Sequence, residues 1–235
     1  MSVPQLPLAL RYPPDQRLGS FVAAPDGVLA QLDAIARGAA SDWVYLTGPA
    51  GTGKTHLALA VCAAAEGAGR SAAYLPLVAA AGRVLDALEA LEGRDVVALD
   101  GLEAIAGQRE DEVALFDFHN RARAAGVTLL YTARHTPDAL GLVLPDLRSR
   151  LSQCGRVMLD VLDDAGRAAV LRERAQRRGL VLEEAAIDWM LTRTGRDLGG
   201  LLGLLDRLDR ESLAAQRRVT VPFLRRVVEG GKPAA

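Results

Sequence analysis

The sequence predicts an α/β fold in which a parallel sheet is flanked by helices and followed by a small helical bundle. Three observations support this prediction. Short apolar runs alternate with helix-like segments over the first two thirds of the chain, an order typical of parallel sheets covered by helices. A glycine-rich loop joins the first apolar run to a helix-like segment. After about Leu162 the apolar runs cease and four helix-like segments follow.

The sheet part is expected to contain four helices and five strands. Apolar residues at helical spacing predict the first helix, and Gly67 and Gly69 end the second. The third strand is apolar and bounded by charged residues, as a buried parallel strand should be. In chain order, the expected helices cover 26–36, 55–66, 82–91 and 110–125, and the expected strands cover 43–46, 71–77, 95–99, 127–132 and 157–161.

The bundle is expected to contain four helices. Either Asp163 or Asp164 can cap the first of them. Thr220 and Pro222 suit the start of the last one, because proline is tolerated in the first turn of a helix. The expected helices cover 163–178, 183–194, 198–216 and 221–229.

The composition is that of an ordinary folded protein. Half of the 235 residues are hydrophobic but only 4% are aromatic, so Ala, Leu and Val must fill the core. Lys and Arg number 28 against 29 Asp and Glu, a balance that does not favour a broad DNA-binding face. The longest apolar run, Leu57 to Ala65, is too short to cross a membrane, and no signal peptide is expected. We therefore expect a cytoplasmic protein whose two cysteines stay reduced.

The strongest motif is a phosphate-binding loop that matches G-x-x-x-x-G-K-[ST] between an expected strand and an expected helix. Glycines let such a loop wrap closely around a phosphate, and its backbone N–H groups point at the negative charge. The lysine places an ammonium against the β- and γ-oxygens, and the last hydroxyl suits Mg²⁺. The motif therefore predicts ATP or ADP binding by Gly48, Pro49, Ala50, Gly51, Thr52, Gly53, Lys54 and Thr55.

An acidic residue at the end of the third strand supports this site. Asp100 is expected beside the loop, where it would hold Mg²⁺ together with Thr55. The next position, where many ATPases of this general type place a water-activating carboxylate, is Gly101. Glu103 is the next acid and a weak candidate for the catalytic base. The chain is thus better equipped to bind nucleotide than to hydrolyse it, and we expect slow intrinsic turnover.

A phosphate-loop α/β domain followed by a helical bundle resembles the AAA+ ATPases. The stretch from Leu144 to Leu151, LPDLRSRL, resembles the arginine-finger segment of the replication initiator DnaA and its relatives. By that match the finger is Arg150, which would act in trans on a neighbour's γ-phosphate. Taken without the resemblance, Arg148 and Arg150 are read as solvated or ion-paired loop charges.

The chain from about Phe21 to Glu229 resembles the whole DnaA-type module, and the residues after it are too few for a DNA-reading helix-turn-helix domain. It is therefore similar to the DnaA regulatory inactivators, the Hda type. The matching phrases are FDFHNR at 116–121, LDRLDR at 205–210 and AQRRVTVPF at 215–223. The resemblance divides the chain into a tail (1–14), an AAA+ nucleotide-binding domain (15–161) and a helical lid (162–235).

The tail resembles the short peptide that bacterial partners insert into the β sliding clamp. Early prolines keep it extended, so it loses little entropy on docking. The resemblance implies that the clamp contacts are Gln5, Leu6, Leu8 and Leu10. Two other interpretations stay open, namely a loose tail and an edge strand on the chain's own sheet. The leucines also suit self-association into a homo-oligomer.

Two positions depart from the family's nucleotide sensors. Thr132 stands where a polar residue senses the γ-phosphate, but Arg134 follows where Asp is common. In the lid, Gly199 stands where the family places a sensing arginine, and Arg196 lies one helical turn earlier as a substitute. These departures fit a protein that stays bound to one nucleotide, ADP or ATP, and acts on a partner.

The resemblance implies a regulator that binds the DNA-loaded clamp, stimulates hydrolysis of DnaA-bound ATP and so prevents over-initiation of replication. Its contact with DNA would be mainly indirect. One alternative is an autonomous AAA+ ATPase or helicase-loader-like protein that hydrolyses its own ATP. Another is a scaffold that binds DnaA without stimulating hydrolysis, with Arg150 in a structural role.

Overall fold

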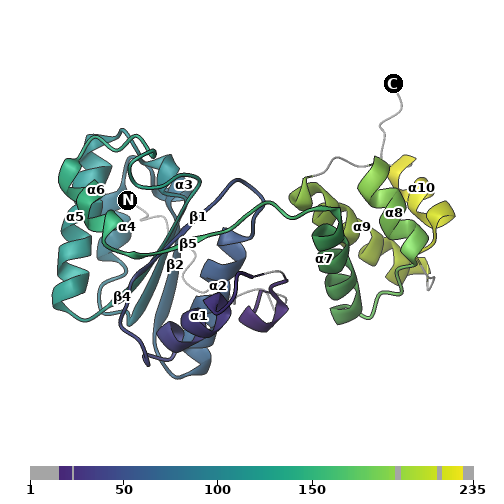
Figure 1. The fold of residues 1–235 in the computed structure, drawn as a ribbon, viewed down its shortest axis with the longest axis horizontal. Coiled ribbons are helices and arrows are strands. Elements are labelled where there is room, and N and C mark those ends of the chain that lie inside the picture. Colours follow the sequence, from purple (N-terminus) through teal and green to yellow (C-terminus); the bar gives the residue numbers. More distant parts are fainter. Residues whose placement is uncertain (1–15, 23, 194–196, 216–218, 230–235) are drawn as a thin grey trace, which may run out of the picture. The chain divides into compact units, whose positions relative to one another are not determined.

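The computed structural model describes residues 16–22, 24–193, 197–215 and 219–229 (Figure 1). The chain divides into two compact units. The first contains Pro25–Gly48 and Lys54–Met158, and the second contains Leu159–Ala235 together with the short segments Ser20–Ala24 and Pro49–Gly53. Among the described residues, no helix combines the length and the apolarity needed to cross a membrane.

The first unit is built on a five-stranded sheet in which every pairing is parallel, as the sequence predicts. The order is β2-β3-β4-β1-β5, so β1 lies between the fourth and fifth strands. The three central strands are almost wholly buried, whereas the edge strands are partly exposed. The strands are β1 (Val44–Thr47), β2 (Ala72–Pro76), β3 (Val96–Asp100), β4 (Thr128–Ala133) and β5 (Gly155–Met158).

Helices cover both faces of this sheet. In Figure 1, α1 and α2 lie on one face, and α4, α5 and α6 lie on the other. Two short 3-10 turns, η1 (Leu18–Ser20) and η2 (Leu102–Ala104), belong to the connections. The helices are α1 (Val28–Ala36), α2 (Lys54–Gly67), α3 (Leu77–Ala80), α4 (Val84–Glu89), α5 (Arg109–Ala124) and α6 (Pro145–Ser152).

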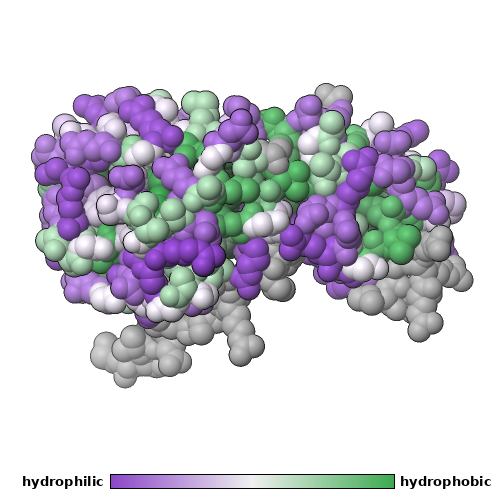
Figure 2. Space-filling model, turned by 60° about the horizontal axis from the view of Figure 1, so that its bottom comes forward, coloured by the Kyte–Doolittle hydropathy of each residue, from purple (hydrophilic) through white to green (hydrophobic). Residues whose placement is uncertain are grey.

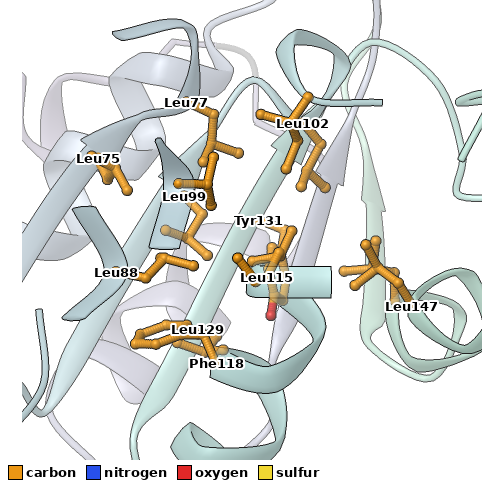
Figure 3. Packing of buried hydrophobic residues seen from close by; sticks show 14 of the residues in the cluster. Leu75, Leu77, Leu88, Leu99, Leu102, Leu115, Phe118, Leu129, Tyr131 and Leu147 are labelled. Atoms are coloured by element: carbon orange, nitrogen blue, oxygen red, sulfur yellow. The ribbon is translucent and has the colours of Figure 1, made fainter. Parts of the chain in front are cut away.

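A core of leucines and a few aromatic rings fixes the sheet against α4, α5 and α6 (Figure 3). Leu99, Leu129 and Tyr131 contribute from the strands, and Leu115 and Phe118 contribute from α5. Of these side chains only Phe118 retains any exposed surface, 3%. Burying each one stabilises the fold by about 1.5–3 kcal/mol. This packing sets the positions of the strand ends, where the candidate site residues lie.

The first unit differs from the expectations in the bounds of two strands and in two helices, α3 and α6. The strand expected at 157–161 covers Gly155–Met158, because the Gly155 N–H donates to the Trp43 carbonyl (2.8 Å) and Gly155 pairs with Val44. The strand expected to reach residue 77 ends at Pro76, and Leu77 begins α3. The helix α6 was not expected. It begins at Pro145 and buries Leu147 and Leu151 in the core, a contact that local sequence does not reveal.

The second unit contains the four expected helices, α7 (Asp164–Arg177), α8 (Glu184–Arg193), α9 (Leu198–Ala215) and α10 (Val221–Glu229). Asp163 caps α7, since its carboxylate accepts a hydrogen bond from the Gly166 N–H at 2.7 Å. Leu205 and Leu208 of α9 are fully buried in the bundle core, while Asp206 between them pairs with Arg178. In Figure 2, hydrophilic residues spread over much of the drawn face, with hydrophobic patches between them.

Candidate functional site

The phosphate loop leads from β1 into α2, as the motif requires. Lys54 is the first residue of α2 and is buried, and its ammonium donates to the Gly48 carbonyl. Burial lowers the pKa of Lys54, while the carboxylates of Glu103 and Asp100 act in the opposite direction. A buried ammonium inside a glycine-rich turn is an arrangement suited to a phosphate, which would replace the carbonyl as its partner.

Gly53 shows why the loop needs glycine. Its φ is +93°, and a Cβ atom at this position would lie 2.5 Å from the Phe21 ring. Left-handed backbone is open to glycine at no steric cost, whereas other residues are strained there. A larger residue at Gly53 is therefore excluded both by the backbone and by the aromatic ring that packs against it.

Three hydroxyl groups converge on the Asp100 carboxylate. Thr55 Oγ1 and Tyr74 OH each donate to Asp100 Oδ2 at 2.8 Å, and Thr132 Oγ1 donates to Asp100 Oδ1. Carboxylate and hydroxyl oxygens are hard donors of the kind that Mg²⁺ prefers. Thr55 and Asp100 thus fit a Mg²⁺ ion, which would supply charge neutralisation at the phosphates.

Tyr74 is a member of this cluster that the sequence reasoning missed. It lies on β2, opposite Ala98 of β3, so its hydroxyl reaches the end of the neighbouring strand. Burial raises the pKa of Tyr74, and the nearby Asp100 charge raises it further. The hydroxyl therefore stays protonated and remains a donor. The available indication was its place within an expected strand next to the strand of Asp100.

The backbone turns sharply directly after Asp100. Gly101 adopts φ +84° and ψ +58°, and its N–H donates to Thr132 Oγ1 at 2.9 Å. A glutamate at this position would be strained, so the absence of a carboxylate here is built into the turn. Thr132 is buried and its hydroxyl bridges Gly101 and Asp100.

Both oxygens of Glu103 are engaged by Arg134. Glu103 Oε1 lies 3.1 Å from Arg134 Nε, and Glu103 Oε2 accepts a hydrogen bond of 3.2 Å from the Arg134 backbone N–H. The sequence alone does not connect these two residues, which lie 31 positions apart. These contacts hold the Glu103 carboxylate against Arg134. The structure thus brings together Lys54, Thr55, Asp100 and Thr132, with Glu103 nearby but paired.

Arg150 lies at the opposite edge of the sheet. It is on α6 and lines a cavity of about 600 Å³ together with Trp43, Thr128 and Gly155. These three residues stand at the starts of parallel strands, whereas Asp100 and the phosphate loop follow strand ends. The six residues of β4 rise about 20 Å between the two edges. Arg150 is therefore not brought together with the loop of its own chain.

Some residues predicted for the site lie outside the described part of the chain. They are Gln5, Leu6, Leu8 and Leu10 of the tail and Arg196 of the lid.

Two family models match the chain. Residues 21–134 match a model described as an IstB-like ATP binding protein. Residues 164–228, which hold α7 to α10 almost completely, match a model described as the lid domain of Hda. The first match covers the phosphate loop, Asp100 and Thr132, and the second covers the helical bundle.

Solved structures of similar fold include replication initiators. Domain III of DnaA from Thermotoga maritima is 17% identical with a TM-score of 0.78, covering 94% of this chain and 99% of that one. AMPPCP-bound DnaA from Aquifex aeolicus is 21% identical with a TM-score of 0.67, covering 88% and 69%. The RuvB Holliday junction branch migration motor of Thermotoga maritima is 20% identical with a TM-score of 0.64, covering 93% and 72%. At these identities the likeness establishes an AAA+ fold.

Proposed function

We propose that the chain inactivates DnaA. The proposal is supported by the match of residues 164–228 to the lid domain of Hda, by the match of residues 21–134 to an ATP-binding protein, and by the AAA+ fold shared with DnaA domain III. In this proposal the chain, bound to its own nucleotide, attaches to the β sliding clamp on DNA. It then stimulates hydrolysis of the ATP that DnaA holds, and so prevents over-initiation of chromosome replication.

The observation that carries the proposal is the separation of Arg150 from the chain's own phosphate loop. The guanidinium lies at the edge of the sheet where strands begin, and the loop lies at the edge where β1 ends. Arg150 therefore cannot complete the site of its own chain, but it can approach a nucleotide held by a neighbour. A guanidinium supplied in trans stabilises the charge on the transferred phosphoryl group and is worth about 10³–10⁵ in rate.

The chain's own site supports binding more than turnover. Lys54, Thr55 and Asp100 are placed to hold the phosphates and Mg²⁺ of ADP or ATP. Gly101 offers no carboxylate, and Glu103 is held by Arg134. In the proposed role the bound nucleotide stabilises the conformation that DnaA recognises, with Thr132 and Arg196 as its sensors. The chain's own hydrolysis is slow.

The tail supplies the tether in this proposal. Gln5, Leu6, Leu8 and Leu10 would enter a clamp pocket through one polar and three apolar side chains. Tethering raises the effective concentration of the regulator near replicated DNA without any new contact to DnaA. Inactivation of DnaA would then follow the loading of clamps.

The test compares two hydrolysis rates. One is the chain's own turnover of ATP, and the other is single-turnover hydrolysis of ATP held by DnaA with the chain and DNA-loaded clamp added. We expect the chain to hydrolyse its own ATP slowly and to accelerate clearly the hydrolysis of ATP held by DnaA. The Arg150→Ala variant should lose that acceleration. Arg148→Ala is the matched control, because Arg148 is exposed on the same helix and does not line the cavity.

Fast own turnover with no effect on DnaA would contradict the proposal and would instead support an autonomous ATPase or helicase-loader-like protein. If the chain binds DnaA but the ATP held by DnaA is not hydrolysed, the result would support the alternative of a scaffold that binds DnaA without stimulating hydrolysis.

A further inference from the structure

The cavity beside Arg150 contains a second guanidinium, that of Arg123. Arg123 lies near the end of α5 and Arg150 near the end of α6, so two helices deliver one cation each to the same cavity. The sequence reasoning singled out only Arg150. The cavity holds about 600 Å³, within the range of sites that take small ligands or parts of larger ones.

Arg123 is held over an aromatic ring that is itself fixed. Its Cζ atom lies 5.8 Å from the centroid of the Trp43 ring, within the range of a cation–π contact. The indole N–H of Trp43 donates to the Val127 carbonyl at 3.0 Å, and its ring meets His119 edge to face at 4.5 Å. The indole is therefore a platform that positions the guanidinium at the cavity without neutralising its charge.

Neither guanidinium is neutralised by a neighbour. Among the residues that the structure describes, Arg123 and Arg150 form no ion pair. Arg121, two residues before Arg123 on α5, pairs with Glu92. Asp42 is the carboxylate that lines the cavity, and within the described part of the chain it forms no ion pair with either arginine. Two cations without carboxylate partners in one cavity produce a strongly positive site that suits an anion.

The buried imidazole of His119, in the cavity wall, is also affected by the charges of the two arginines. The pKa of His119 is lowered to about 4, first by burial and then by the charges of Arg123 and Arg150. His119 is therefore neutral at physiological pH, and its Nδ1 lies 3.0 Å from the Tyr131 hydroxyl. It contributes a polar wall and no further positive charge, so the two arginines are the groups that would bind an anion.

We propose that Arg123 and Arg150 together form a receptor for a single phosphoryl group, the γ-phosphate of a nucleotide held by a partner protein. This inference rests on the proposed function, because that function brings DnaA-bound ATP to this edge. Two planar guanidinium groups can hydrogen-bond several phosphate oxygens at once. As the γ-phosphoryl group transfers, charge spreads over its three equatorial oxygens, and two cations neutralise it better than one.

The first experiment measures single-turnover hydrolysis of DnaA-bound ATP, with DNA-loaded clamp present, over a range of chain concentrations. We expect Arg123→Ala to lower the rate constant at saturation by about tenfold or more, with the half-saturating concentration changed less than threefold. Arg121→Ala is the matched control, because Arg121 is exposed on the same helix and pairs with Glu92 outside the cavity. Arg123→Lys keeps the charge but loses the planar fork, and we expect an intermediate rate.

The second experiment separates a partner's nucleotide from a free anion. With ADP and Mg²⁺ saturating the phosphate loop, tripolyphosphate is titrated against the Trp43 fluorescence of a Trp189→Phe variant. We expect binding only at millimolar concentrations. Micromolar binding that Arg123→Ala abolishes, with unchanged stimulation of DnaA, would overturn the inference in favour of a free-anion site.

The failures of the two proposals are distinguishable. Absence of stimulation by the wild-type chain would contradict the proposed function itself. Stimulation that needs Arg150 but is equal in Arg123→Ala and Arg121→Ala would overturn this inference alone. Thermal unfolding of each variant, followed by circular dichroism, establishes that a lost rate is not a lost fold. If Arg123→Ala does not fold, the rate constant of Arg123→Lys tests the inference instead. A wild-type rate constant in Arg123→Lys would contradict the role of the planar guanidinium.

Discussion

The residues around Asp100 determine what the nucleotide site can do. Thr55, Tyr74 and Thr132 direct their hydroxyls at its carboxylate, which leaves hard oxygen ligands in one place. Glu103 is a nearby carboxylate, and Arg134 engages both of its oxygens. From these contacts we expect a site that binds nucleotide and hydrolyses it slowly.

Release of Glu103 should raise the chain's own ATP hydrolysis. If Glu103 can serve as a base, Arg134→Ala frees its carboxylate and we expect at least about a tenfold faster basal turnover. The double variant Arg134→Ala/Glu103→Gln should return to the wild-type rate. Steady-state phosphate release measures both. Arg156→Ala, which removes an exposed arginine from β5, is the control for surface charge. A basal rate unaffected by Arg134→Ala would show that Glu103 is not a restrained base.

At the scale of elements, α5 and β4 are joined by a polar contact inside an apolar core. His119 of α5 is only 1% exposed, and its Nδ1 lies 3.0 Å from Tyr131 OH of β4. The low pKa of His119, about 4, means that the folded protein keeps the imidazole neutral where the unfolded chain would protonate it. The association of α5 with the sheet therefore depends on pH.

This contact predicts a loss of stability in mild acid. The contribution of neutral His119 is fully present above the ordinary histidine pKa of about 6.5 and is lost as the pH falls to about 4. The full effect on the free energy of unfolding is about 3 kcal/mol. Urea unfolding at pH 7.5, 5.5 and 4.5 measures it. His119→Gln keeps a polar side chain that does not titrate, so its pH slope should be smaller. Equal slopes in both proteins would contradict the account.

The elements show which parts of the fold could be predicted. The helix at 221–229 was predicted with its observed bounds, because Pro222 and the apolar spacing are local features. The phosphate loop and Asp100 were predictable for the same reason. The helix α6 was missed because its order comes from burying Leu147 and Leu151.

The missed site contacts are all long-range. Arg134 with Glu103, Tyr74 with Asp100, and Arg123 with Trp43 join segments at least 26 residues apart, as Tyr74 and Asp100 are. No spacing rule connects such residues. Only the parallel order β2-β3-β4-β1 brings them together at the two edges of the sheet.

At the scale of the whole α/β unit, the parallel direction of the strands separates two groups of residues, one at each edge of the sheet. The edge where the central strands end carries the phosphate loop and Asp100, and the edge where they begin carries Arg150 and Arg123. In the proposed function, one edge holds the chain's own nucleotide and the other meets a nucleotide on a partner. The tail would add the clamp as the place where that meeting occurs, and this is the central claim of the account.

The most direct measurement is single-turnover hydrolysis of radiolabelled ATP bound to DnaA, with and without DNA-loaded clamp. We expect the chain to accelerate hydrolysis only when the clamp is loaded. Gln5→Ala should lose the clamp dependence and most of the acceleration, and Arg150→Ala should lose the acceleration while still binding the clamp. No acceleration with any bound nucleotide, or equal acceleration by all three proteins, would contradict the account.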